Sequence, residues 1–150
     1  MQCNKFINFN FHIYSMEPSE ILEKTYNLFL ISEIVENTSD IDKELEGLLL
    51  DRDYENMAKT LIYALMYTLN SDPAYRNIRQ IYLNETIDLL YAIDRIGFND
   101  EKIIKKFVNL LYQFYSYSLQ YKIKFIADKE KRELVKAKLD ELVNIIQWEK

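Results

Sequence analysis

The chain has 150 residues, 49% of them hydrophobic, and a formal net charge of −5, which together describe one ordinary globular domain. Its 8 Phe, 12 Tyr and 1 Trp are too much apolar surface to leave in water, and this excludes a disordered chain. With only Gly47 and Gly97 available, no glycine-rich phosphate loop can be written, which excludes the nucleotide-binding folds that need one.

Cysteine and histidine occur once each, as Cys3 and His12. One subunit therefore cannot build a metal site from thiolates and imidazoles, and a single pair near a chain end is weak support for a nucleophile. Low cysteine use suits a reducing compartment, and neither a signal peptide nor a membrane-spanning apolar run is visible. We expect a cytoplasmic protein without a cofactor.

Residues 6–14 alternate between apolar and polar side chains, a pattern typical of a β-strand with one buried face. An alternative is that Met16 is the functional start, in which case these residues are dispensable. Pro18 then opens a helix, because its missing N–H has no partner in a first turn. The positions expected inside that helix are Ile21, Leu22, Thr25, Leu28, Phe29, Ser32 and Val35.

Residues 37–40 are turn formers that interrupt the periodicity, and a short helix through Leu45, Leu48 and Leu49 follows. Asp53 caps the next helix, and Asp72 with Pro73 marks the start of another. That helix either ends near Asn84 or continues to a stop at Gly97. The buried stripe expected before Asp72 consists of Met57, Ala58, Leu61, Ile62, Leu65 and Leu69. The apolar residues of the helix after Asp72 are Ile78, Ile81, Ile87, Leu90, Ala92, Ile93 and Ile96.

Asp100 opens a further helix that carries apolar residues at three- and four-residue steps. Residues 116–126 then alternate with period two, which predicts a second strand, although the same stretch could simply continue the helix. Asp128 caps the last helix. The inward residues expected on the helix that starts at Asp100 are Ile103, Ile104, Phe107, Val108, Leu111 and Phe114. The apolar residues of the last helix are Leu134, Val135, Leu139, Leu142, Ile145, Ile146 and Trp148.

These elements predict a mainly α fold, a compact domain of six or seven helices spanning residues 1–150. Residues 6–14 and 116–126 are expected to pair as a small two-stranded antiparallel β ribbon that lies on the helices. If that ribbon is real, the class becomes α+β. No repeat and no low-complexity linker divides the chain.

Charge is distributed unevenly along the chain. Residues 1–100 hold 17 acidic and 8 basic residues, a net −9, whereas residues 101–150 hold 7 acidic and 11 basic residues, a net +4. Lysines interleaved with tyrosines are typical of surfaces that bind single-stranded nucleic acid, where cations hold phosphates and rings stack on bases. The candidate contacts are Lys105, Lys106, Lys122, Lys124, Lys129, Lys131, Arg132, Tyr117 and Tyr121.

A simpler explanation is that these lysines are the solvated face of an edge strand and the tyrosines are half-buried core residues. The acidic segment 17–55 offers a different surface, which could attract a basic partner protein.

Two pairs of carboxylates are spaced so that each pair shares one helix face, and Mg²⁺ prefers such oxygen ligands. They are Glu33 with Glu36 and Glu85 with Asp88. This arrangement resembles the paired acidic motifs of all-α nucleotide pyrophosphohydrolases of the MazG kind, and the resemblance implies Mg²⁺-dependent hydrolysis. The doubled Glu that opens the family's first motif is absent, and the two motifs are farther apart than in that family.

Contact, rather than catalysis, is the function that the sequence favours. We expect a non-catalytic accessory or structural subunit that binds another protein, for example within a nucleoprotein assembly. Small helical subunits of CRISPR effector complexes in thermophilic archaea offer a class analogy, and a viral source suits the composition equally. Single-stranded nucleic-acid binding and Mg²⁺-dependent pyrophosphohydrolysis are the alternatives.

Overall fold

The computed structural model of the protein describes residues 17–32, 39–121 and 128–147, and within them it contains six α-helices and one short 3-10 helix. The predicted mainly α class is confirmed. The helices are α2 (Pro18–Ser32), α3 (Ser39–Leu50), α4 (Tyr54–Ser71), η1 (Pro73–Tyr75), α5 (Arg79–Ile96), α6 (Glu101–Gln120) and α7 (Lys129–Gln147).

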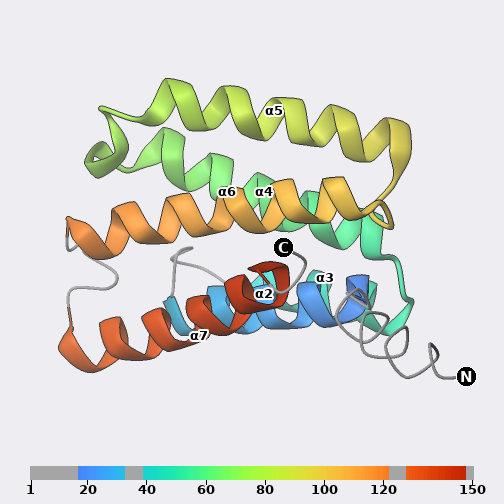
Figure 1. Ribbon diagram of the computed structural model, residues 1–150, viewed down its shortest axis with the longest axis horizontal. Helices are drawn as coiled ribbons and strands as arrows, with labels where there is room; N and C mark the ends of the chain where they lie inside the picture. The colour runs from blue at the N-terminus through green and yellow to red at the C-terminus, as the bar shows by residue number, and fades with distance from the viewer. Residues whose placement is uncertain (1–16, 33–38, 122–127, 148–150) are drawn as a thin grey trace, which may run out of the picture.

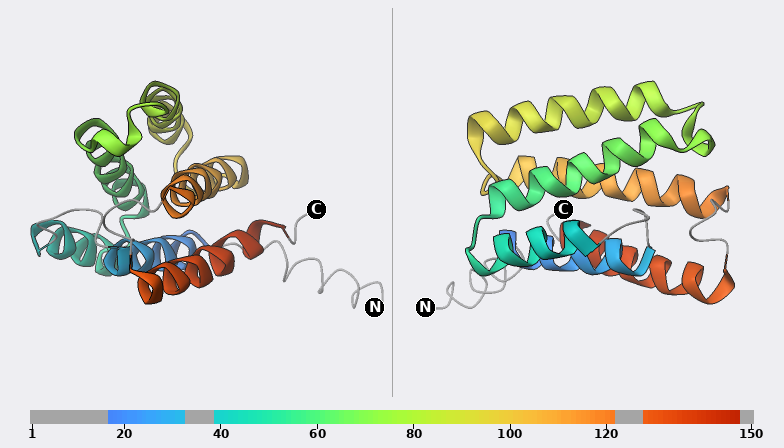
Figure 2. Two further views of the ribbon diagram at one scale, coloured as in Figure 1. Left: turned by 90° about the vertical axis from the view of Figure 1, so that its left-hand side faces the viewer. Right: turned by 180° about the vertical axis from the view of Figure 1, so that it is seen from behind.

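The helices are stacked in tiers. In Figure 1, α5 lies at the top, α4 and α6 lie beneath it, and α2, α3 and α7 form the bottom. Figure 2 shows the bundle from one end, with α3, α2 and α7 side by side in the lowest tier and α5 resting on α4 and α6. Because α5 covers only these two helices, much of its surface is left facing away from the core.

Aspartate caps begin α4, α6 and α7 where the sequence predicts them, whereas Asp72 caps only the three-residue η1, and α5 starts later, at Arg79. The Asp100 carboxylate accepts hydrogen bonds from the backbone N–H groups of Lys102, at 2.8 Å, and Ile103, at 3.2 Å. Asp53, Asp72 and Asp128 make equivalent bonds at the starts of α4, η1 and α7. Each such bond satisfies a backbone donor that the first helical turn would otherwise leave unpaired.

The predicted apolar stripes form one continuous core. The inward positions of α2, α4 and α6 are buried as expected, and Leu45, Val135, Leu139 and Leu142 add the contributions of α3 and α7. Two tyrosines, Tyr75 and Tyr115, are also completely buried. Val35 and Trp148 lie outside the described residues, as do the side chains of Ile145 and Ile146.

The predicted strand over residues 116–126 is wrong for its first part, because α6 continues to Gln120. Ser118, assigned to the polar face of a strand, is fully buried and donates a hydrogen bond to the Phe114 carbonyl, one helical turn back. A helix satisfies its backbone groups within the segment, whereas a ribbon needs a partner strand. Residues 122–126 and the other expected strand, 6–14, lie outside the described residues.

Four aliphatic residues of the predicted helices lie outside the core. Ile81, Ile87, Ile96 and Leu134 are 41–62% exposed, although α5 does run on to Gly97. On α5 only Tyr82, Thr86, Leu89 and Ile93 are buried, a narrow stripe along one side of the helix. The sequence pattern predicted where α5 ends but not which of its isoleucines are buried, because that depends on the neighbouring helices, which lie on one side of α5 only.

Candidate interaction surfaces

The residues predicted to contact nucleic acid do not form one surface. Lys105 and Lys106 lie in the first turns of α6, whereas Tyr117 and Tyr121 lie at its other end. With a rise of 1.5 Å per residue, Lys105 and Tyr121 are about 24 Å apart along the helix. Lys129, Lys131 and Arg132 begin α7, whose first turn adjoins the end of α6. Lys122 and Lys124 lie outside the described residues.

Two members of the predicted set are engaged in structural contacts. The Arg132 guanidinium donates to the Leu119 carbonyl through Nη2 and so caps the end of α6. The Tyr117 hydroxyl donates to the Ala74 carbonyl over 3.2 Å, which ties α6 to η1. These groups hold the fold together, which leaves the exposed Tyr121 and Lys129 as the more accessible members at this end.

Carboxylates accompany the lysines on both helices. Lys105 forms an ion pair with Glu101 at 3.6 Å, and Lys138 forms one with Glu141 at 3.7 Å. In α7 as a whole, five basic residues alternate with four acidic ones. The positive charge of α7 is therefore largely balanced within the helix, which weakens the field that a polyanion would feel there, whereas α6 carries three lysines and one glutamate.

Four aromatic rings form a column that runs from the core to the surface. Tyr75 stacks on Phe114 with ring centroids 4.9 Å apart, and Tyr117 continues the column 5.7 Å from Tyr75. Tyr121 ends it, with its ring 4.5 Å from that of Tyr117 and more than half exposed. Aromatic pairs of this kind stabilise a fold beyond the area that they bury.

Three tyrosine hydroxyls are held in their protonated form by burial. Removal from water raises the pKa of Tyr75 and Tyr115 well above the usual value, and the bonds to Ser118 and Ser32 offset this only in part. Burial likewise raises the pKa of Tyr82 to about 12, and its hydroxyl donates to the Gln113 carbonyl over 2.9 Å. At neutral pH these groups act as hydrogen-bonding ties between helices rather than as bases.

One predicted carboxylate pair lies in a groove between α5 and α6. Glu85 and Asp88 line this open groove of about 250 Å³ together with Lys106 and Asn109 from α6. A divalent cation held here would share the groove with the Lys106 ammonium, which is an unfavourable neighbour. The other pair, Glu33 and Glu36, lies outside the described residues, so the predicted four-carboxylate site stays a prediction.

The most distinctive surface lies on the outer side of α4 and α5. Tyr63 and Tyr67 follow each other by one turn on α4 and are 57% and 65% exposed. Ile87 and Tyr91, one turn apart on α5, are 41% and 66% exposed. Side chains four residues apart lie on the same side of a helix. We call these four residues the α4–α5 face.

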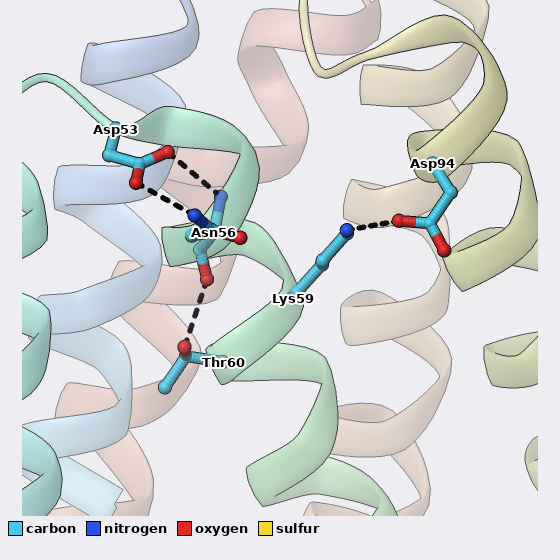
Figure 3. A network of polar contacts seen from close by, with 5 residues as sticks. All are labelled: Asp53, Asn56, Lys59, Thr60 and Asp94. Carbon is cyan, nitrogen blue, oxygen red and sulfur yellow. Dashed lines mark hydrogen bonds and ion pairs between the residues drawn. The ribbon is translucent and has the colours of Figure 1, made fainter.

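Polar contacts at both ends hold the two helices of this face in register. Figure 3 shows the Lys59 ammonium on α4 paired with the Asp94 carboxylate on α5, beside the capping contacts of Asp53 and Asn56. Near the other end, Arg79 Nε donates to the Leu69 carbonyl over 2.7 Å.

Two ionisable side chains near the α4–α5 face, Lys59 and Arg79, make contacts within the protein, whereas the exposed Arg95 follows Tyr91 by one helical turn. Hydrogen bonding to Asp94 raises the pKa of Lys59, so this ion pair persists at neutral pH. Arg79 reaches inward to backbone carbonyls, and Glu85 and Asp88 lie on the side of α5 next to α6. The centre of the face is thus aromatic and aliphatic, without a net charge.

Sequence reasoning missed the α4–α5 face because it considered only the tyrosines near the C-terminus, as stacking or half-buried core residues. A signal was present in the sequence, since apolar side chains occupy more of the circumference of α4 and α5 than one buried stripe requires. Only the placement of the neighbouring helices shows which of these side chains remain outside.

Comparisons with models of known protein families, with curated proteins and with solved structures find no significant match. Within the described residues, no group of three or more His, Cys, Asp or Glu side chains is arranged to hold a metal ion. No helix in that part of the chain is long and apolar enough to cross a bilayer.

Proposed function

We propose that this protein acts by contact, as a non-catalytic accessory or structural subunit that docks a protein partner on its α4–α5 face. The observation that carries the proposal is the exposure of Tyr63, Tyr67, Ile87 and Tyr91 on two adjacent helices. Aromatic and aliphatic side chains gathered on a surface leave apolar area in contact with water, and exposed patches of this kind mark interaction sites.

The composition of the face fits protein recognition. Tyrosine is among the residues that dominate the binding energy of protein interfaces, because it combines a large ring with a hydroxyl that can donate and accept. Charged residues are depleted at the centres of such interfaces, as they are on this face. The ties at Lys59 and Arg79 keep the two helices rigid, which lowers the conformational entropy lost on binding.

The test is site-specific photocrosslinking in an extract of the source organism. A photoreactive benzophenone amino acid replaces Tyr91 in one variant and Tyr121 in the control, which has a similar exposed fraction of 58%. We expect a specific crosslinked protein from position 91 only. Binding to that protein, once purified, should weaken about 30-fold or more in the Tyr91→Glu variant, the effect of losing a hot-spot residue.

Equal crosslinking from both positions, or none from position 91, would contradict the proposal. So would unchanged affinity of Tyr91→Glu for the purified partner. Far-UV circular dichroism of each variant checks that its helices are intact.

A further inference from the structure

We infer that α3 acts as a cover that opens by local unfolding while the other helices stay folded, and that its opening uncovers apolar surface of α2 and α4. Elements of low local stability can unfold on their own, and they have few buried apolar side chains and weak contacts with their neighbours. α3 has these properties and lies at the edge of the bottom tier, beside α2 (Figure 2). Such an opening is independent of the docking proposed for the α4–α5 face.

Few apolar side chains anchor α3 to the rest of the protein. Within residues 41–50 only Leu45 is buried. Leu48 and Leu49 are half-buried, and Leu50 is 77% exposed. By contrast, α4 and α6 bury side chains along most of their length. Because burial of apolar area is the main force that holds a helix in place, α3 is held more weakly than any other α-helix within the described residues.

Polar contacts do not compensate for this small buried area. The Ser32 and Tyr115 hydroxyls join α2 to α6, and the Lys59–Asp94 pair joins α4 to α5. In the part of the chain that the structure describes, no hydrogen bond or ion pair joins a side chain of residues 41–50 to another helix. α3 can therefore leave its neighbours without breaking a specific polar contact.

The sequence of α3 is also a weak helix former. Its 12 residues are a length at which an isolated helix is marginal in water, and Gly47 lies in its interior, where glycine is less favourable than alanine. Asp42 and Glu46 are like charges one turn apart, and Lys43 is the only basic residue of the helix. Carboxylates suit a first turn, but the last turn has no basic residue to complement the helix dipole. Its folded state therefore depends on tertiary contacts.

The turn that joins α3 to α4 holds backbone strain. Arg52 has a φ of 59°, a left-handed conformation that costs an L residue free energy. This conformation is fixed by the end of α3, because the N–H groups of Arg52 and Asp53 bond to the carbonyls of Leu49 and Leu48. Unfolding of α3 breaks these bonds and releases the strain, which favours the open state.

Packing beneath α3 is incomplete. An apolar cavity of about 20 Å³ lies among α2, α3 and α4, and its lining includes Phe29, Leu45, Leu61 and Ala64. Side chains that border a void lack contacts on that side, so α3 gains less from its position there than close packing would give. When α3 opens, Phe29 of α2 and Leu61 and Ala64 of α4 become accessible to solvent.

Hydrogen exchange detected by NMR on the full-length chain, in increasing urea below the unfolding transition, tests this behaviour. It follows the amides of residues 43–50, which bond within α3, and those in the middle of α6. We expect the α3 amides to be at least about 10-fold less protected than those of α6. Their exchange should change little with urea, because a local opening exposes little surface, whereas α6 exchange should accelerate steeply.

Two variants separate local opening from unfolding of the whole domain. Ile93 is fully buried on α5, in the tier farthest from α3 (Figure 1), so Ile93→Val destabilises the closed and the opened protein equally. It should speed α6 exchange about 2- to 10-fold and leave α3 exchange unchanged. Gly47→Ala favours the helical state of α3 and should slow α3 exchange about 2- to 5-fold.

Equal acceleration of α3 and α6 exchange by Ile93→Val would show that α3 opens only with the whole domain, and would overturn the inference. So would α3 amides with the same protection and urea dependence as those of α6. Unchanged α3 exchange in Gly47→Ala would show that the helix does not unfold as it opens, with the same consequence. None of these outcomes bears on the crosslinking test at position 91.

Discussion

Hydrogen bonds between buried hydroxyl groups hold α2 and η1 against α6. The Tyr115 hydroxyl meets Ser32 Oγ at 2.9 Å, and Tyr75 pairs with Ser118 in the same interior. Each serine also donates to a carbonyl of its own helix, so the hydroxyls of these two tyrosines and two serines all have hydrogen-bond partners. Replacing one tyrosine by phenylalanine removes a single neutral bond and should cost about 1 kcal/mol of stability.

These tyrosines should make the protein sensitive to alkali. Burial raises the pKa of Tyr75 and Tyr115 above the unfolded value of about 10. Below pH 10 their contribution to stability is complete, and above it the unfolded state loses protons that the folded state retains. The free energy of unfolding should then fall by at most about 1.4 kcal/mol per pH unit for each such group.

Urea unfolding at pH 8 and pH 11 measures this loss. The double variant Tyr75→Phe, Tyr115→Phe should lose less stability between the two pH values than the unmodified protein. Tyr121→Phe, which removes an exposed hydroxyl, is the control. An equal loss in the double variant would show that other groups govern the alkaline response.

At the scale of the helices, local sequence signals set the ends and tertiary packing set the faces. Asp53, Asp100 and Gly97 act where the sequence places them, because caps and stops depend on a few neighbouring residues. The period-two pattern after residue 116 misled, because two of its apolar members, Tyr117 and Tyr121, are also spaced by one helical turn. Burial of Ser118 against Tyr75 decides in favour of the helix.

The two glycines provide a test with opposite expected signs. Gly97 has a φ of 98°, which an L residue adopts with strain, so Gly97→Ala should destabilise the protein by about 1–3 kcal/mol. Gly47 lies inside α3 with open space beside its Cα, so Gly47→Ala should stabilise by about 0.5–1 kcal/mol. Thermal unfolding of both variants checks this. A stabilising Gly97→Ala would show that the residue does not act as a backbone-determined stop.

For the whole molecule, the distribution of charge in space differs from its distribution along the chain. The C-terminal third is basic in sequence, but its lysines are divided between two ends of α6 and interleaved with carboxylates. A single-strand-binding surface needs its cations along one groove. The outer sides of α4 and α5 gather uncharged aromatic residues instead.

We therefore expect only non-specific affinity for nucleic acid, with a dissociation constant no tighter than about 1 μM at physiological salt. Fluorescence anisotropy with a labelled single-stranded RNA at two salt concentrations measures it. The pair Lys129→Ala, Lys131→Ala should weaken binding no more than the pair Lys105→Ala, Lys106→Ala. Tighter binding that depends on Lys129 and Lys131 alone would favour the nucleic-acid alternative over protein contact.

The sequence by itself determined that the chain is mainly helical, where most helices begin and end, and which residues on α2, α4 and α6 form the core. These features follow from periodicity and capping, which involve residues within a few positions of one another. Only the tertiary structure decided that Tyr115 is buried while Tyr63 and Tyr91 are exposed. A side chain's exposure depends on which helices cover it, and that neighbourhood is set by contacts between residues far apart in the chain.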